Sequence, residues 1–204
     1  MNEKQFLFEE IDRHLCGDNA PEKYLDSLKE PIFQSEYPFT MLSRLKGIEQ
    51  SPKHHPEGNV WNHTILVVGQ AAKRKEQSSD VRAFMWAALL HDIGKAETTK
   101  IRKGKITAYD HDRAGAKLAK EFLKHFTGDS AFIEKVAALV RWHMQILYVV
   151  NALPYADIKT MKQQTDVWDI ALLGLCDRLG RTGADLQKEE ENIKDFLMKC
   201  EEGC

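Results

Sequence analysis

Apolar residues recur at helical spacing along most of the chain, and no long stretch alternates at the strand period of two. The pattern predicts short amphipathic helices over about residues 3–15 and 21–28, separated by a helix breaker at 17–21. A further helix should begin near Asn59, a plausible N-cap, and another near Asp80, which also caps well and whose helix Gly94 should end. These patterns predict an all-α fold.

The second half of the chain continues in the same way. Apolar side chains repeat every four residues from Ala114 to Phe126, and helical stripes follow over 132–143 and 166–180. Within the last stripe, Gly174 would let another backbone approach closely. A charged helix over about 185–198 is expected to finish the chain. Residues 101–109 are too polar and too short for core, so we expect a loop or hairpin there, covering the candidate site described below.

Composition narrows the class of protein. The 204 residues suffice for one folding unit with a full core, and 43% hydrophobic with 29% charged residues is ordinary for a globular protein. No apolar run is long enough to span a bilayer, and the first residues lack the pattern of a signal peptide, so we expect a cytoplasmic protein without a membrane partner. The net charge of −2 argues against binding of long nucleic acid. The basic run 102–105 supports a local contact at most.

The four cysteines do not form a C-x-x-C motif, which argues against a zinc knuckle. We expect reduced, structural thiols at Cys16 and Cys176, with Cys200 and Cys204 at a frayed end of the chain.

Metal-binding chemistry is indicated by histidines and aspartates on the predicted apolar faces. The apolar run 87–95 ends in His91 and Asp92, and the whole ordered set is His63, His91, Asp92, His111, His143 and Asp177. Burying such groups separately would require a separate partner for each, whereas convergence on one cation satisfies them together. Imidazole and carboxylate donors suit Mn, Fe, Co, Ni or Zn, and suit Mg less well.

Three blocks of sequence, 45–64, 87–95 and 177–181, resemble the HD-domain superfamily of metal-dependent phosphohydrolases. The nearest likeness is to the HD domain of bacterial CCA-adding tRNA nucleotidyltransferases. The resemblance covers about 45–183 and implies a helical bundle with a metal site between core helices. We expect a single HD-type domain over 1–204, with 1–44 and 184–204 as appended helices. The nucleotidyltransferase motifs are absent from these residues, so we do not expect this chain alone to add CCA ends.

The resemblance also implies roles for individual residues. It assigns metal ligation to His63, His91, Asp92 and Asp177. His111 and His143 match two histidines that hold a second metal in some HD proteins and contact phosphate in others, so one or two ions remain possible. The residue after the third histidine is often Glu in the family, and here it is Asp112.

A mechanism follows from the chemistry of phosphate esters. A divalent ion can hold a phosphoryl oxygen and lower the pKa of bound water from about 15.7 toward roughly 7. Asp92 is a candidate to orient the attacking water, in addition to ligating the metal. Lys95 either neutralises charge on the phosphoryl oxygens or interacts with a helix C-terminus. Arg178 and Arg181 are candidates for phosphate or base contacts, and the alternative for each is pairing with Asp177.

The expected partner is a nucleotide or another small phosphate ester, and an RNA end is a further candidate. We expect either a 2',3'-cyclic nucleotide phosphodiesterase or a nucleotidase. A non-catalytic module that binds nucleotides or RNA ends is the alternative, although an intact donor set disfavours it. A zinc deaminase is excluded because its P-C-x-x-C element is missing.

Overall fold

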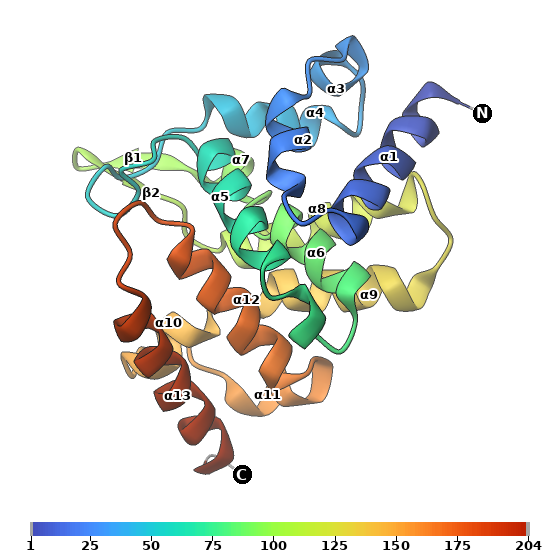
Figure 1. Ribbon diagram of the computed structural model, residues 1–204. Coiled ribbons are helices and arrows are strands. Elements are labelled where there is room, and N and C mark those ends of the chain that lie inside the picture. Colours follow the sequence, from blue (N-terminus) through green and yellow to red (C-terminus); the bar gives the residue numbers. More distant parts are fainter. Residues whose placement is uncertain (1, 203–204) are drawn as a thin grey trace.

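The computed structural model describes residues 2–202, which form helices joined by short loops (Figure 1). The first part of the chain contains, in order, α1 (Glu3–Gly17), α2 (Pro21–Ser27), α3 (Pro31–Ser35), α4 (Thr40–Ser43), the 3-10 helix η1 (Arg44–Gly47), α5 (Val60–Ala72), the 3-10 helix η2 (Lys75–Gln77), α6 (Val81–Leu90) and α7 (Lys95–Thr98). The predicted all-α fold is confirmed.

The second part begins with a β-hairpin, one of the two forms expected for the polar segment 101–109, and its strands pair antiparallel. The elements that follow α7 are β1 (Lys100–Arg102), β2 (Lys105–Thr107), α8 (His111–Lys124), α9 (Ser130–Trp142), α10 (Gln145–Val150), α11 (Ile158–Gln164), α12 (Val167–Leu179) and α13 (Leu186–Glu202).

Side-chain caps fix the starts of the helices that later carry the site. The carboxamide of Asn59 accepts a hydrogen bond from the backbone N–H of Asn62, and Asp80 does the same for Ala83. Each cap satisfies a backbone donor that has no partner within its helix. The predicted starts of α5 and α6 are therefore confirmed.

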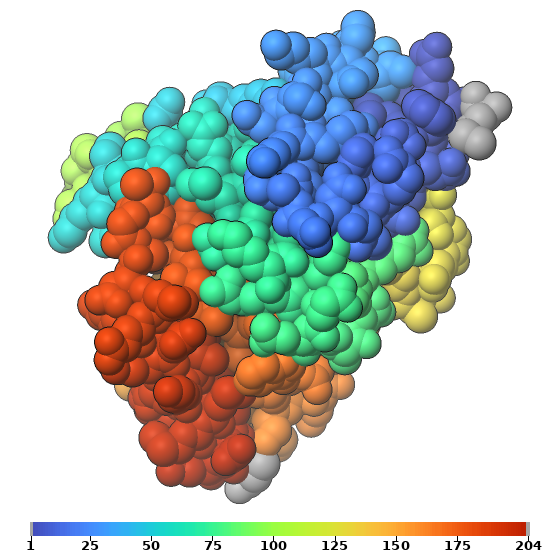
Figure 2. Space-filling view, viewed as in Figure 1, coloured from blue at the N-terminus to red at the C-terminus, as the bar shows by residue number. Residues whose placement is uncertain are grey.

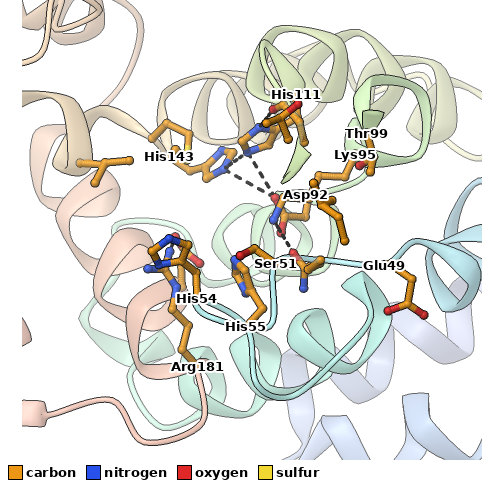
Figure 3. A pocket seen from close by; sticks show the side chains of 17 residues that line it. Glu49, Ser51, His54, His55, Asp92, Lys95, Thr99, His111, His143 and Arg181 are labelled. Atoms are coloured by element: carbon orange, nitrogen blue, oxygen red, sulfur yellow. Dashed lines mark hydrogen bonds and ion pairs between the residues drawn. The ribbon is translucent and has the colours of Figure 1, made fainter. Parts of the chain in front are cut away.

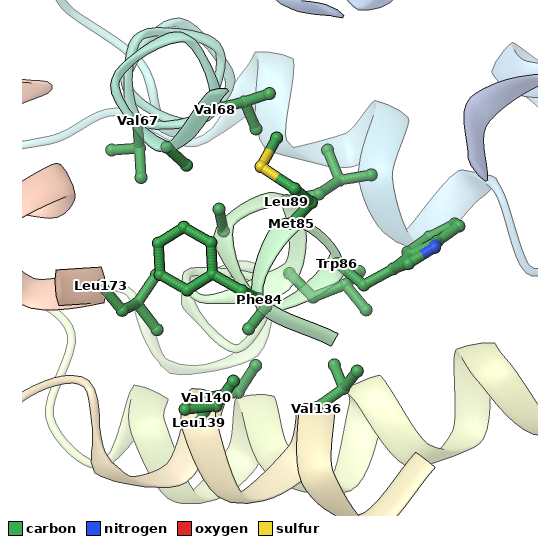
Figure 4. Close-up of a cluster of buried hydrophobic side chains, with 14 of the residues drawn as sticks. Val67, Val68, Phe84, Met85, Trp86, Leu89, Val136, Leu139, Val140 and Leu173 are labelled. Atoms are coloured by element: carbon green, nitrogen blue, oxygen red, sulfur yellow. The ribbon is translucent and has the colours of Figure 1, made fainter. Parts of the chain in front are cut away.

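Helix α6 lies at the centre of the core, because its residues 83–90 are all apolar and all buried. Figure 4 shows α6 end-on, with Val67 and Val68 of α5 on one side and Val136 and Val140 of α9 on the other. Leu173 of α12 closes a third side. A central helix held on three sides gives its C-terminal end a fixed position, and that end carries His91 and Asp92.

The N-terminal helices complete this core although they lie outside the sequence resemblance. Phe8 of α1 stacks on Trp86 of α6 with ring centroids 4.8 Å apart. The carboxylate of Asp12 accepts hydrogen bonds from Nε1 of Trp86, at 2.6 Å, and from Nε of Arg82, at 2.9 Å. One cluster of buried side chains extends from α1 through α6 to α13.

Two glycines have a different role from the predicted one. Helix α6 ends at Leu90, so the expected end at Gly94 is wrong. Gly94 has a helical φ of −67°, and a Cβ there would lie 2.1 Å from the carbonyl oxygen of His111. A glycine is needed because α8 begins directly against it. At Gly174 a Cβ would lie 1.8 Å from Cδ1 of Ile146, so a side chain, not the predicted backbone, makes the close approach.

Smaller corrections concern α8 and the C-terminal region. The fully buried stripe of α8 runs through Gly115, Ala119 and Phe122, whereas Ala114 is half-buried. Cys200 is buried within α13, so it does not belong to a frayed end, and Cys204 lies outside the described residues. Across 2–202, no helix combines the length and apolar character needed to cross a membrane.

Candidate metal centre

Six predicted residues converge from separate elements into one buried group beside a pocket. His63 lies in α5 and Asp177 in α12, and their side chains face each other across the core. The remaining four lie at helix ends: His91 and Asp92 after α6, His111 at the start of α8 and His143 after α9. All six are buried, and Asp177 is the most exposed of them at 8%. Figure 3 shows His111 and His143 together on one side of Asp92.

The four residues that the resemblance implied as ligands meet directly. Nε2 of His63 lies 2.9 Å from Oδ1 of Asp177, although the two residues are 114 positions apart in the chain. Oδ2 of Asp92 lies 3.3 Å from Nε2 of His91 and 3.9 Å from Nε2 of His63. Nitrogen and oxygen donors from three helices thus point into one small space.

A second group forms on the other oxygen of the same carboxylate. Oδ1 of Asp92 lies 3.4 Å from Nε2 of His111 and 3.9 Å from Nε2 of His143. Ligand atoms of Asp92, His111 and His143 all lie within 4.8 Å of one another, as do those of His63, His91 and Asp92. Asp92 therefore belongs to both groups, one oxygen to each.

The backbone fixes the tautomers of three of these histidines. Nδ1 of each ring lies 2.7–2.9 Å from a carbonyl oxygen three residues earlier in the chain, and the three rings are His91, His111 and His143. A carbonyl can only accept a hydrogen bond, so Nδ1 carries the proton and Nε2 presents its lone pair to the site.

Whether the residues fit a metal depends on what faces these Nε2 lone pairs, and no hydrogen-bond donor among residues 2–202 does so for His91. Nε2 of His91 is buried and has no hydrogen-bond partner among residues 2–202. Nε2 of His111 and Nε2 of His143 lie 3.2 Å apart, and two unprotonated nitrogens at that distance repel each other. A cation between such donors removes both costs, so the residues fit a divalent metal.

Glu57 is a site residue that sequence reasoning missed. Nδ1 of His63 donates to Oε1 of Glu57 at 2.9 Å, and Nδ1 of His55 lies 2.8 Å from the same oxygen. The backbone N–H of Thr182 donates to Oε2 at 3.2 Å. Burial would raise the pKa of Glu57, but the hydrogen bonds from His63, the backbone and His55 lower it to about 2. A carboxylate behind a ligating histidine is the usual way to fix such a ring.

The only sequence signal for Glu57 was its place in the loop before α5. Gly58 in that loop has a backbone φ of 101°, a turn conformation that favours glycine. The fold adds Glu57 to the site because the loop turns back over His63.

Electrostatics keep the aspartates ionised. Burial would raise the pKa of Asp92, but the charge of Lys95 and the neighbouring histidines hold it well below its usual range. The same balance, with Arg181 and His63 as the opposing groups, lowers the pKa of Asp177. Burial lowers the pKa of His143 to about 4, and the nearby His111 adds to that effect. Ionised carboxylates beside neutral imidazoles are the protonation states that metal binding requires.

Burial would also lower the pKa of His63, yet its hydrogen bonds to Asp177 and Glu57 raise it instead. Each ring nitrogen of His63 faces a carboxylate, so the protonated, positively charged form of the ring is favoured. That positive charge lies beside the position proposed for the metal ion.

Of the three cationic residues predicted to contact phosphate, Lys95 and Arg181 line the pocket and Arg178 does not. Nζ of Lys95 lies 2.6 Å from Oδ2 of Asp92 and donates to Oε1 of Gln50 at 2.7 Å. Arg181 faces the same pocket, with Nη2 3.4 Å from Oδ2 of Asp177. Arg178 instead pairs with Glu189 of α13 at 2.9 Å, and it does not line the pocket beside Lys95.

The pocket has a volume of about 330 Å³ and opens beside Asp92. Its lining includes the cationic side chains of Lys95 and Arg181 and the apolar side chains of Ile106, Met144 and Leu147. The hairpin contributes Ile106 and Thr107, so the expectation that residues 101–109 cover the site is met at the β2 end. A pocket lined by both apolar side chains and a few charged ones suits a small organic anion.

Comparison with known proteins agrees with this arrangement. Residues 60–169 match the family model described as HD domain, and the chain belongs to that family. Proteins with this domain bind divalent metals and are typically metal-dependent hydrolases. All the candidate donors except Asp177 lie within the matched residues.

Curated relatives extend the similarity to most of the chain. It is 28% identical over 192 residues to the Multifunctional CCA protein of Actinobacillus pleuropneumoniae, covering 94% of this chain and 41% of that protein. It is 30% identical over 189 residues to the Multifunctional CCA protein of Pasteurella multocida, covering 88% of this chain and 43% of the relative. The chain thus spans about two fifths of these relatives, and the resemblance inferred from the sequence is confirmed.

Proposed function

We propose that this protein is a metal-dependent phosphohydrolase that acts on phosphate esters of nucleotides. The observation that carries the proposal is the pair of donor groups that share Asp92 at the wall of a pocket also lined by Lys95 and Arg181. In this proposal one ion is held by His63, His91, Asp92 and Asp177, and a second by Asp92, His111 and His143.

The donor set favours particular metals. Four imidazoles and two carboxylates match Mn, Fe, Co, Ni or Zn better than Mg, which prefers oxygen ligands and keeps several waters. A bound divalent ion supplies Lewis-acid polarisation of a phosphoryl oxygen and lowers the pKa of water from 15.7 to about 7.

The chain's own residues bind and orient the substrate. The side chains of Lys95 and Arg181 approach the pocket from different elements, so an anionic phosphoryl group between them is neutralised from two directions. Nε of Arg181 is buried without a hydrogen-bond partner among the described residues, which leaves it available to a ligand oxygen. Asp92 is ionised and accepts a hydrogen bond from the attacking water, which orients it toward phosphorus.

The apolar part of the pocket lining favours a nucleotide over a phosphate ester that lacks a sugar or base. Ile106, Met144 and Leu147 offer surface for a sugar or base, while Lys95 and Arg181 bind the phosphate. Both a 2',3'-cyclic phosphodiester and a phosphomonoester satisfy this arrangement, so both belong in the test.

The test compares metal-stripped protein with protein reloaded with Mn²⁺, Co²⁺, Ni²⁺ or Mg²⁺, using 2',3'-cyclic AMP and 2'-, 3'- and 5'-AMP as substrates. We expect hydrolysis of at least one nucleotide with a transition metal, and its loss in Asp92→Asn. The matched control is Asp110→Asn, because Asp110 is exposed and has a left-handed backbone (φ 59°) that Asn tolerates. Tight nucleotide binding without turnover under any metal would establish the non-catalytic module instead.

A further inference from the structure

The β-hairpin carries an unusual concentration of positive charge that the proposed hydrolysis does not use. Four of the six residues from Lys100 to Lys105 are basic, and all six are exposed. None of these four side chains forms an ion pair within residues 2–202, although acids slightly outnumber bases over the whole chain. The hairpin lies at the edge of the molecule, beside the segment that follows η1 (Figure 2).

Strand register places the charges on one face. Arg102 pairs with Lys105 across the hairpin, and Lys100 pairs with Thr107. Directly opposed residues share a face, and so do residues two apart along a strand. Arg102, Lys105 and Lys100 therefore form a cationic face that ends at Thr107, which lines the pocket.

This face is unfavourable for the isolated protein. Arg102 and Lys105 are like charges directly opposite each other, an arrangement that destabilises a strand pair. The two-residue turn adds Lys103 and Gly104, both with positive φ, at 49° and 74°. No acid among residues 2–202 forms an ion pair with these side chains, so an external polyanion would relieve their repulsion.

An aromatic residue completes the surface. Tyr109 is 63% exposed just after β2, and the guanidinium carbon of Arg102 lies 5.3 Å from the centre of its ring. An exposed aromatic ring beside unpaired cations is the combination that binds single-stranded nucleic acid, because bases stack on rings while cations follow the backbone.

We infer that the hairpin binds the backbone of a single-stranded oligonucleotide whose terminal phosphate ester occupies the pocket. The identity of the pocket occupant rests on the proposed function; the hairpin contacts rest on charge and geometry. The turn lies about 10 Å along the strand from Thr107, at about 3.3 Å per residue. That length matches about three phosphates of a stacked strand, at about 3.4 Å each.

The experiment measures binding of a 5'-fluorescein hexaribonucleotide with a 3'-phosphate by fluorescence anisotropy at several salt concentrations. The hairpin variant is Arg102→Gln/Lys103→Asn/Lys105→Gln, with Asn at 103 because it tolerates positive φ. The matched control, Lys23→Gln/Lys29→Gln/Lys124→Gln, removes the same charge from exposed positions away from the pocket. Thermal unfolding verifies that both variants fold.

We expect the hairpin variant to bind the hexanucleotide at least about tenfold more weakly at 0.1 M salt. The slope of log K against log salt should fall by about two, at roughly 0.7 per lost phosphate contact. The control should retain wild-type affinity and slope. Unchanged binding in the hairpin variant, or an equal loss in the control, would overturn the inference.

Two further measurements separate the possible failures. Phosphatidylserine vesicles test for a membrane occupant, and vesicle binding that depends on the hairpin without any oligonucleotide binding would also overturn the inference. Turnover of 2',3'-cyclic AMP and of the AMP isomers is measured separately. If all of these nucleotides resist hydrolysis while the hairpin still governs oligonucleotide affinity, the proposed function fails and the oligonucleotide surface stands.

Discussion

Replacing Glu57 with Gln tests whether the carboxylate behind His63 sets metal affinity. Glu57 is 3% exposed at its side chain and receives hydrogen bonds from His63 at 2.9 Å and from Thr182 at 3.2 Å. Gln keeps the shape but loses the charge, and its one carbonyl oxygen cannot replace both carboxylate oxygens. At least one donor then loses its partner, and the ring of His63 is no longer held in one tautomer.

The hydrogen bond between Glu57 and His63 sets the expected loss of metal affinity in Glu57→Gln. Losing such a supporting carboxylate costs about 10- to 100-fold in metal affinity. That factor corresponds to about 1.4–2.7 kcal/mol of binding free energy. A buried donor left without a partner costs a further 1–3 kcal/mol, roughly, in the free energy of unfolding.

The assay is competition between protein and a chelator for Co²⁺, with the visible absorption spectrum of bound Co²⁺ as a second readout. The matched control is Glu49→Gln, an exposed residue of the same pocket. We expect weaker binding and an altered spectrum for Glu57→Gln only. Wild-type affinity in a folded Glu57→Gln protein would refute this reasoning about His63.

Three further predictions concern stability. Gly94→Ala should shift α8 by about 1 Å, because the new Cβ would otherwise lie 2.1 Å from the carbonyl oxygen of His111. The free energy of unfolding should fall by roughly 1–3 kcal/mol. Calorimetry measures this change, and an unchanged Tm would contradict the prediction. Burial, together with the nearby His111 and His91, lowers the pKa of His143 to about 4. As the pH falls, this imidazole is therefore protonated in the unfolded chain before it is protonated in the folded protein. The free energy of unfolding of the metal-free protein should fall by roughly 3 kcal/mol from pH 6.5 to 4. In His143→Gln, this contribution to the pH dependence of the unfolding free energy should be absent when denaturation is measured at several pH values. Chelator should lower the Tm of metal-loaded protein, and excess metal should restore it.

Much of the site was predictable because its residues follow local rules. Helical spacing placed His63, His91, His143 and Asp177 on inward faces, and capping chemistry located the starts of α5 and α6 at Asn59 and Asp80. Periodicity and capping act over a few residues, so they are readable from the chain itself.

Contacts between distant segments were not readable in this way. Only the folded chain shows that Asp92 gives one oxygen to each donor group, that Glu57 supports His63, and that Arg178 pairs with Glu189. The need for glycine at position 94 likewise comes from a distant segment, because α8 begins directly against it. Sequence by itself determined which side chains face inward; the tertiary structure decided which of them meet, because the packing of helices far apart in the chain sets those distances.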